Sequence, residues 1–296
     1  MKKVSDSMIA LHFDGNFIKD NSISARTLGH ALTAIQRMVD KTVIFERRGS
    51  IKKGDVLPAV WNSEADLVVK PFEKGCITVP LVGLQDVGAI SLLKGVLHDP
   101  FEEAISDDPI EKQSLVEGIP AAVNRANNKI GTISHEKLIK DSKAREHRYF
   151  AEAIYRDFDN LISPLRSSTI ADEDIISVEL KDKNGSLEYE FNKLISKRFH
   201  KIVSAKQLGP TVHYSGRLTE FGETKSRHFP YSGRFYSNAS KHEHKLLIAD
   251  EMDAEKLRSF NTAKNKQLNF FGAPVSAWGA FDEQKGDIVF LKLILE

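Results

Sequence analysis

The sequence has a single cysteine, Cys76, and this scarcity excludes two kinds of site. One cysteine cannot close a disulfide within the chain, and it cannot supply a zinc or iron–sulfur centre built from several cysteines. Long apolar runs are missing too, because the most apolar stretch, residues 76–97, is interrupted by Pro80, Asp86 and Lys94. The basic N-terminus is not followed by the apolar segment of a signal peptide. We therefore expect a cytoplasmic protein that does not engage a membrane.

Catalytic signatures are also missing. The chain contains no phosphate loop, no G-x-G-x-x-G and no G-x-S-x-G motif. Nuclease-like acid-x-Lys triplets occur five times, but only Glu179–Lys181 lies well inside an expected strand. His242 and His244, two residues apart on a strand, would point the same way and are the best metal candidate, although exposed surface histidines explain them as well. A metal-dependent hydrolase or nuclease stays an alternative, while the sequence favours a non-catalytic protein with no cofactor.

Length and composition indicate a folded protein of two domains. The 296 residues are 41% hydrophobic and 28% charged, with a formal net charge of +1, which is typical of globular chains longer than one ordinary core. Residues 164–173 form the best boundary, because Pro164 ends a helical pattern there. This predicts a mixed α/β and helical domain over 1–165 and a β-barrel-like domain over 174–296.

Apolar spacing places the elements of the first half. We expect a strand over 8–13, a turn at Asp14-Gly15, and a helix from about residue 24 to 45 that ends before Gly49. A hairpin should occupy 66–72 and 76–83, followed by helices over about 86–97 and 134–163. The acidic stretch 99–117 reads as a solvated connector or as a face that docks on a basic surface.

The second half is rich in strands. Asn184-Gly185 predicts a hairpin between 175–181 and 187–191. Further strands and one helix follow, over 199–206, 212–219, 229–237, 244–249, 252–260 (the helix), 266–271 and 287–294. Three strands, a helix and two strands at the end of the chain is the order of an OB-like barrel, although a generic small antiparallel barrel or sandwich shares it. The fold class is α+β, with a small antiparallel β-barrel at the C-terminus.

One short repeat lies inside this region. Tyr214-Ser215-Gly216-Arg217 recurs 17 residues later as Tyr231-Ser232-Gly233-Arg234. On adjacent antiparallel strands the two glycines would mark bulges or a close approach of the two backbones. A coincidence of strand composition gives the same pattern.

The small net charge conceals segments of opposite sign. Residues 99–117 carry seven acids and one lysine, whereas residues 193–241 carry ten Lys and Arg, two acids and seven interleaved aromatics. Basic side chains neutralise phosphates, and flat rings stack on unpaired bases. The candidate nucleic-acid-binding residues are Lys197, Arg198, Tyr214, Arg217, Lys225, Arg227, Tyr231 and Arg234. Core packing of the aromatics, or pairing of the basic segment with the acidic one, is the competing interpretation.

Two motifs resemble an uncharacterised bacterial family. Its members begin with strand–Asp–Gly–helix, here from Leu11 to Gly15, and end with a small β-domain that contains a Gly-Arg element, here Gly216 to Glu220. The resemblance touches roughly the first and last hundred residues. It implies no activity, but it places such proteins near mobile-element and phage-defence genes.

These observations favour a binding protein that engages nucleic acid, or a nucleoprotein partner, through its basic C-terminal β-domain. The second hypothesis is a protein-interaction or homo-oligomeric scaffold subunit that uses helix 24–45 or helix 134–163 as its interface.

Overall fold

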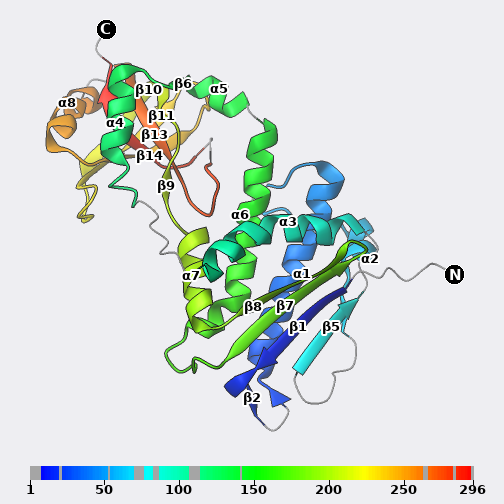
Figure 1. The fold of residues 1–296 in the computed structure, drawn as a ribbon. Helices are drawn as coiled ribbons and strands as arrows, with labels where there is room; N and C mark the ends of the chain where they lie inside the picture. The colour runs from blue at the N-terminus through cyan, green and yellow to red at the C-terminus, as the bar shows by residue number, and fades with distance from the viewer. Residues whose placement is uncertain are drawn as a thin grey trace. The chain divides into compact units, whose positions relative to one another are not determined.

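The computed structural model describes residues 8–19, 22–52, 54–69, 77–82, 87–106, 114–140, 142–262, 266–282 and 285–294. The chain forms two compact units, coloured along the sequence in Figure 1. The first unit consists of Met1–Ile110 and Tyr149–Ser204, and the second of Glu111–Arg148 and Ala205–Glu296. The α+β class is confirmed.

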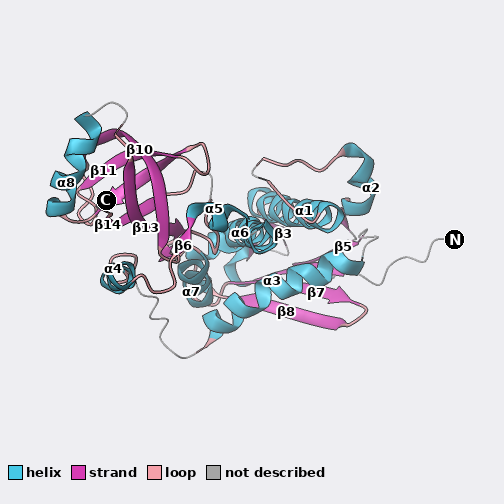
Figure 2. Ribbon diagram, turned by 90° about the horizontal axis from the view of Figure 1, so that it is seen from above, coloured by secondary structure: helices cyan, strands magenta, loops and turns pink. Residues whose placement is uncertain are grey.

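The first unit is an antiparallel sheet with helices packed on one face (Figures 1 and 2). The sheet order is β4-β5-β1-β7-β8, so the first strand of the chain lies at its centre. Its strands are β1 (Met8–Asp14), β4 (Val68–Val69), β5 (Ile77–Val82), β7 (Ile175–Asp182) and β8 (Gly185–Phe191), with a separate pair β2 (Ile18–Lys19) and β3 (Ser22–Ile23). Its helical elements are η1 (Gly15–Phe17), α1 (Ala25–Arg48), η2 (Ala59–Trp61), α2 (Asn62–Ala65), α3 (Val87–Ile105), most of α6 (Ser142–Ile162), η3 (Ser163–Arg166) and α7 (Lys193–Val203).

The two units do not follow the boundary that the sequence suggests. The predicted domains 1–165 and 174–296 would separate β7 from β1, yet these strands pair along their whole length, from Met8 opposite Lys181 to Asp14 opposite Ile175. Three aromatic rings also join this sheet to two helices of the first unit. Phe158 on α6, Phe191 on β8 and Phe199 on α7 lie with their centroids 5.4 Å apart in each pair. Pro164 ends the helix as expected, but the chain then returns to the first sheet.

Two further predictions differ from the structure, and a third falls partly outside the described residues. The sequence pattern predicts a strand over 199–206, but α7 runs from Lys193 to Val203 because Asn192 caps it by accepting from Ile195 N, and Phe199, Ile202 and Val203 share a buried face. The helix expected over 134–163 is helical in the described residues on both sides of position 141, as α5 (His135–Lys140) and α6, and residue 141 itself lies outside the described residues. Helix α3 continues past Pro100 to Ile105, so the first part of the acidic stretch 99–117 is helical rather than a connector.

The Asp14-Gly15 turn is held by a buried carboxylate from a distant segment. Asp174, which is fully buried, accepts hydrogen bonds from the backbone amides of Asn16 and Ala171. Gly15 has φ of +82°, and a Cβ there would collide with Asp174. The motif at the start of the chain is therefore a structural turn.

The second unit is a closed barrel. Strands β10 (Val212–Glu223), β11 (Tyr231–Ser237), β12 (Glu243–Ile248), β14 (Ile288–Leu293) and β13 (Leu268–Ser276) follow one another in that order, and β13 pairs back onto β10. The pairing of β12 with β14 is parallel, and α8 (Glu251–Thr262) lies between the third and fourth strands of the chain order. This is the strand order and helix position of an OB-type barrel. The remaining elements are α4 (Ile119–Asn128), β6 (Ile133–Ser134), α5 and β9 (Gln207–Leu208).

The repeated Tyr-Ser-Gly-Arg segments lie on the neighbouring strands β10 and β11, as their spacing predicts. A Cβ on Gly216 would collide with the carbonyl oxygen of Tyr236, and one on Gly233 would lie 2.7 Å from that of Glu220. The pairing also shifts register between Leu218 and Glu220. The two glycines therefore let the backbones approach closely on either side of a bulge.

Among the residues that the structure describes, no helix is both long and apolar enough to cross a membrane.

Candidate nucleic-acid interface

The outer face of β10, β11 and β12 carries two exposed cations of the predicted set, Arg217 and Arg234. Strand alternation turns one set of residues inward, and register aligns the others in two rows across the three strands. One row contains Arg217, Tyr236 and Glu243, and the next contains Glu220, Arg234 and Lys245. In an OB-type barrel, the face of the second and third strands and the loop between the first and second are the parts that hold oligonucleotides or sugars.

The first row places a cation over an aromatic ring. The guanidinium carbon of Arg217 lies 5.0 Å from the ring centroid of Tyr236, directly opposite it on the next strand. Arg217 is exposed and Tyr236 is partly buried. A guanidinium held over a ring can itself stack on an unpaired base or meet a phosphate.

The second row is largely neutralised. Arg234 Nε lies 2.9 Å from Glu220 Oε2, and its NH1 atom lies 3.5 Å from Glu243 Oε2. Thr219 Oγ1 donates to the backbone carbonyl of Arg234 or to Glu243 Oε1, at 3.1 and 3.0 Å. Both ion pairs are well exposed, so they contribute little to stability, but they place two carboxylates beside the predicted phosphate contact.

The turn between β10 and β11 is held by three hydrogen bonds and carries exposed basic side chains. Thr224 Oγ1 donates to the carbonyl of Phe229 at 2.5 Å and accepts from Ser226 N at 3.0 Å. Phe229 N in turn donates to Ser226 Oγ at 3.2 Å. These bonds leave three exposed side chains at the tip, Lys225, Arg227 and His228, and within the described residues none of the three has an ion-pair partner.

Two of the predicted aromatic contacts face the barrel interior. Tyr214 is fully buried, with its ring 5.3 Å from Phe270 and 6.1 Å from Phe235, so the prediction that it stacks on a base is wrong. Tyr231 is partly buried, parallel to Phe221 at 6.2 Å. Partial burial, with the carboxylates of nearby acids, raises the pKa of the Tyr231 hydroxyl.

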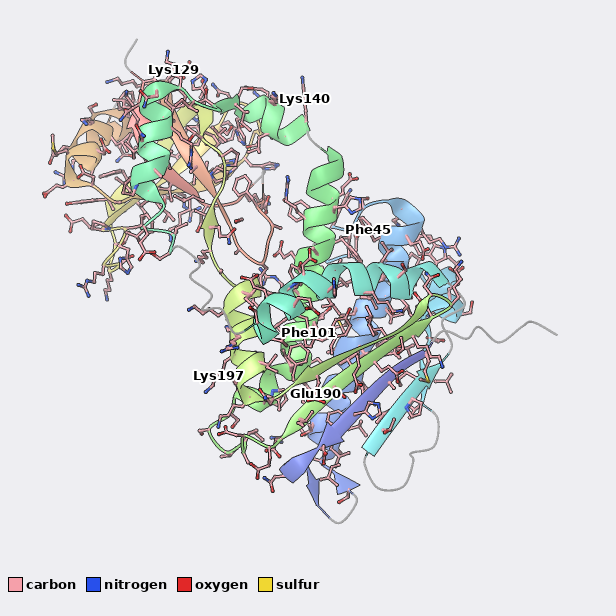
Figure 3. The ribbon with its side chains drawn as sticks, viewed as in Figure 1. Phe45, Phe101, Lys129, Lys140, Glu190 and Lys197 are labelled. Carbon is pink, nitrogen blue, oxygen red and sulfur yellow. The ribbon has the colours of Figure 1, made fainter. Side chains whose placement is uncertain are left out.

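The basic segment 193–241 does not form one surface. Lys197 and Arg198 lie on α7, which belongs to the first unit (Figure 3), and Arg198 donates to the carbonyl of Ser106 at 3.0 Å. The prediction that these two residues belong to the barrel site is wrong, because residues 193–203 form a helix of the first unit. The barrel keeps Arg217, Lys225, Arg227 and Arg234.

The histidine pair proposed as a metal site has another role. His244 is buried, its Nδ1 lies 3.0 Å from the carbonyl of Gly286, and its Nε2 lies 2.9 Å from Ser240 Oγ. Both ring nitrogens are therefore occupied by the protein. In the described part of the chain, no group of three or more His, Cys, Asp or Glu side chains is placed to hold a metal ion. At the other candidate, Glu179 Oε1 accepts from Ser186 Oγ at 2.6 Å.

Sequence reasoning missed Tyr236 and Lys245. Period-two alternation on β11 would have found the first, because Tyr231, Gly233 and Phe235 point inward and leave Ser232, Arg234 and Tyr236 outside. Lys245 lies opposite Arg234 only because β12 pairs with β11 in that register, which the local sequence does not reveal.

The charge of the chain is divided between the two units. The second unit contains 21 Lys and Arg against 16 Asp and Glu, and the first contains 21 against 25. The barrel unit is thus the basic half of a nearly neutral protein. Comparison with family models, with curated proteins and with solved structures finds no match to this chain.

Proposed function

We propose that the second unit binds single-stranded nucleic acid across β10, β11 and β12. The observation that supports this most is the combination of an OB-type strand order with exposed cations where such barrels hold their ligands. These cations are Arg217 on the strand face, and Lys225 and Arg227 on the loop between the first two barrel strands.

The contacts divide between the two ends of the β10–β11 hairpin. Arg217 and Tyr236, which lie opposite each other, form the end away from the turn. Lys225 and Arg227, on the turn itself, form the tip. Residues two apart on one strand face are about 7 Å apart, so the outward side chains between these ends lie along a line. A strand of nucleic acid laid along it would meet cations at both ends.

The carboxylates between the two ends favour bases over phosphates there. Glu220 and Glu243 would repel a phosphate beside Arg234, but they accept hydrogen bonds from base amino groups. A single strand can turn its bases toward the protein, whereas a duplex offers phosphates and groove edges. This arrangement therefore favours a single strand over a duplex as the ligand.

The test is fluorescence anisotropy of the full chain with short labelled single strands at about 50 and about 200 mM salt. The Lys225→Gln/Arg227→Gln variant should bind more weakly, and its salt slope should fall by about 0.7 for each phosphate that the protein no longer neutralises. The matched control is Lys197→Gln/Arg198→Gln, which removes two cations from the first unit and should bind as the wild type does. Absent or salt-insensitive binding, or equal weakening in both variants, would contradict the proposal.

A further inference from the structure

An open surface pocket, here called the cavity, lies where the β10–β11 hairpin meets α8. It has a volume of about 430 Å³ and is lined by Phe221, Gly222, Glu223, Arg258 and Asn261. This is within the range of pockets that hold small ligands. The cavity is separate from the outer face described above, because strand alternation turns Phe221 toward the barrel interior.

The apolar wall of the cavity is flat. Phe221 lines it, and the Tyr231 ring backs Phe221 in a nearly parallel orientation, with 10° between the ring planes. A Cβ added at Gly222 would meet no atom within 4 Å. Because Gly222 has no side chain, the neighbouring position on β10 adds no bulk next to Phe221.

The polar wall can both accept and donate hydrogen bonds. Glu223 offers carboxylate oxygens and Asn261 offers an amide, and neither side chain bonds to another described residue. Arg258 gives one N–H to Glu255, at 2.7 Å, which leaves its other donors available. Acceptor and donor groups side by side match the edge of a base that carries an amino group next to a ring nitrogen, as adenine and cytosine do.

The Glu223 carboxylate disfavours a phosphate in the cavity, and Arg258, the one cation of its lining, already pairs with Glu255. Lys225 and Arg227 follow Glu223 by two and four residues on the bonded turn. Anion contacts thus border the cavity while a ring-shaped, amino-bearing group fits inside it.

We propose that this cavity takes one amino-bearing base of a single strand, with the adjoining phosphate on Lys225 or Arg227. The inference rests on the proposed function and adds a base preference to it. Glu223 can accept from the exocyclic amino group that adenine and cytosine carry and that thymine and uracil lack, so strands of adenine or cytosine should bind more tightly than strands of thymine.

The experiment compares oligo-dA, oligo-dC and oligo-dT of equal length on the full chain at one salt concentration. The wild type should bind oligo-dA and oligo-dC at least about fivefold more tightly than oligo-dT. Glu223→Gln should remove most of this preference, and Asn261→Ala should reduce it. Both residues are exposed at the cavity rim, so the variants should fold.

The matched control is Glu251→Gln, which removes a carboxylate from the same helix as Arg258 but outside the cavity lining. It should keep the wild-type preference. Binding without a base preference, or a preference that survives in Glu223→Gln, would overturn the cavity proposal and leave the proposed function standing. Failure of all three strands to bind would overturn both.

Discussion

The Oγ atom of Ser240 lies 2.9 Å from Nε2 of His244, and the Nδ1 atom of that ring lies 3.0 Å from the carbonyl oxygen of Gly286. Because a carbonyl only accepts, Nδ1 carries the hydrogen and Nε2 accepts from the serine hydroxyl. Burial lowers the pKa of His244, although Gly286 and the acids Asp282 and Asp287 act in the opposite direction. The folded barrel therefore holds this histidine neutral.

A pH dependence of barrel stability follows from the neutral histidine. Below the ordinary histidine pKa of about 6.5 the unfolded chain binds a proton that folded His244 does not, so the free energy of unfolding should fall as the pH drops from that value. In a Trp61→Phe background, Trp278 is the only tryptophan and reports urea unfolding of the second unit. His244→Gln should lose less stability between about pH 7.5 and 5.5 than its parent does.

The control for this comparison is His213→Gln, which removes an exposed histidine from β10 and should keep the pH dependence of its parent. If His244→Gln and the parent lose stability in parallel, the assigned proton state of His244 is wrong.

Gly15→Ala should destabilise the first unit by about 2 kcal/mol or more, because the new Cβ collides with Asp174 at a positive φ. Urea unfolding followed by Trp61 in a Trp278→Phe background measures the change. Gly29→Ala is the matched control: a Cβ there meets nothing within 4 Å, and alanine inside α1 should stabilise by about 0.5–1 kcal/mol. Equal effects at the two positions would contradict the role assigned to the turn.

Gly216→Ala should destabilise the barrel by about 1–3 kcal/mol, since the Cβ has no room beside Tyr236 and the ring of Phe235. Gly222→Ala on the same strand meets no neighbouring atom and should be close to neutral. Both are read from Trp278 fluorescence in urea. A tolerated Gly216→Ala would show that β10 and β11 can separate at the repeat.

The Glu220→Gln/Glu243→Gln variant should bind single strands more tightly than the wild type at low salt, by about tenfold, because two repulsive charges are removed while the glutamine carbonyls still accept from base amino groups. The reason is that Arg234 loses both ion pairs and the face gains net positive charge. Anisotropy at two salt concentrations checks it, and the gain should shrink as salt rises. Unchanged affinity would place the nucleic acid away from this face.

Local patterns predicted the strands of both units, but they predicted the assembly of the barrel and not that of the first sheet, and the difference has a physical cause. The five barrel strands and α8 alternate with short turns, so their sequence order already indicates the topology. The hairpin at Asn184-Gly185 is predicted as well, but its partner strand, β1, lies more than 150 residues earlier, and nothing in the local pattern names that partner.

The candidate site was also predicted only in part, because local patterns do not reveal which strands pair or in which register. Arg217, Lys225 and Arg227 lie exposed on the barrel because basic strand and turn residues usually face solvent. The prediction for Tyr214 is wrong because a tyrosine on a strand is equally suited to a core. Its even-numbered neighbours Val212 and Leu218 are buried, and strand alternation turns Tyr214 to the same buried face. Register, which brings Glu220 and Glu243 to Arg234, requires the folded sheet.

The chain crosses between the two units three times, at residues 110–111, 148–149 and 204–205. Neither unit is a continuous stretch of sequence, so during synthesis from the N-terminus each unit can be completed only after its last segment has been made. Until residues 175–182 leave the ribosome, β1 has no partner on one side and its backbone groups on that edge stay open. A fragment ended near residue 165 keeps that open edge permanently, and it should aggregate rather than behave as an isolated domain.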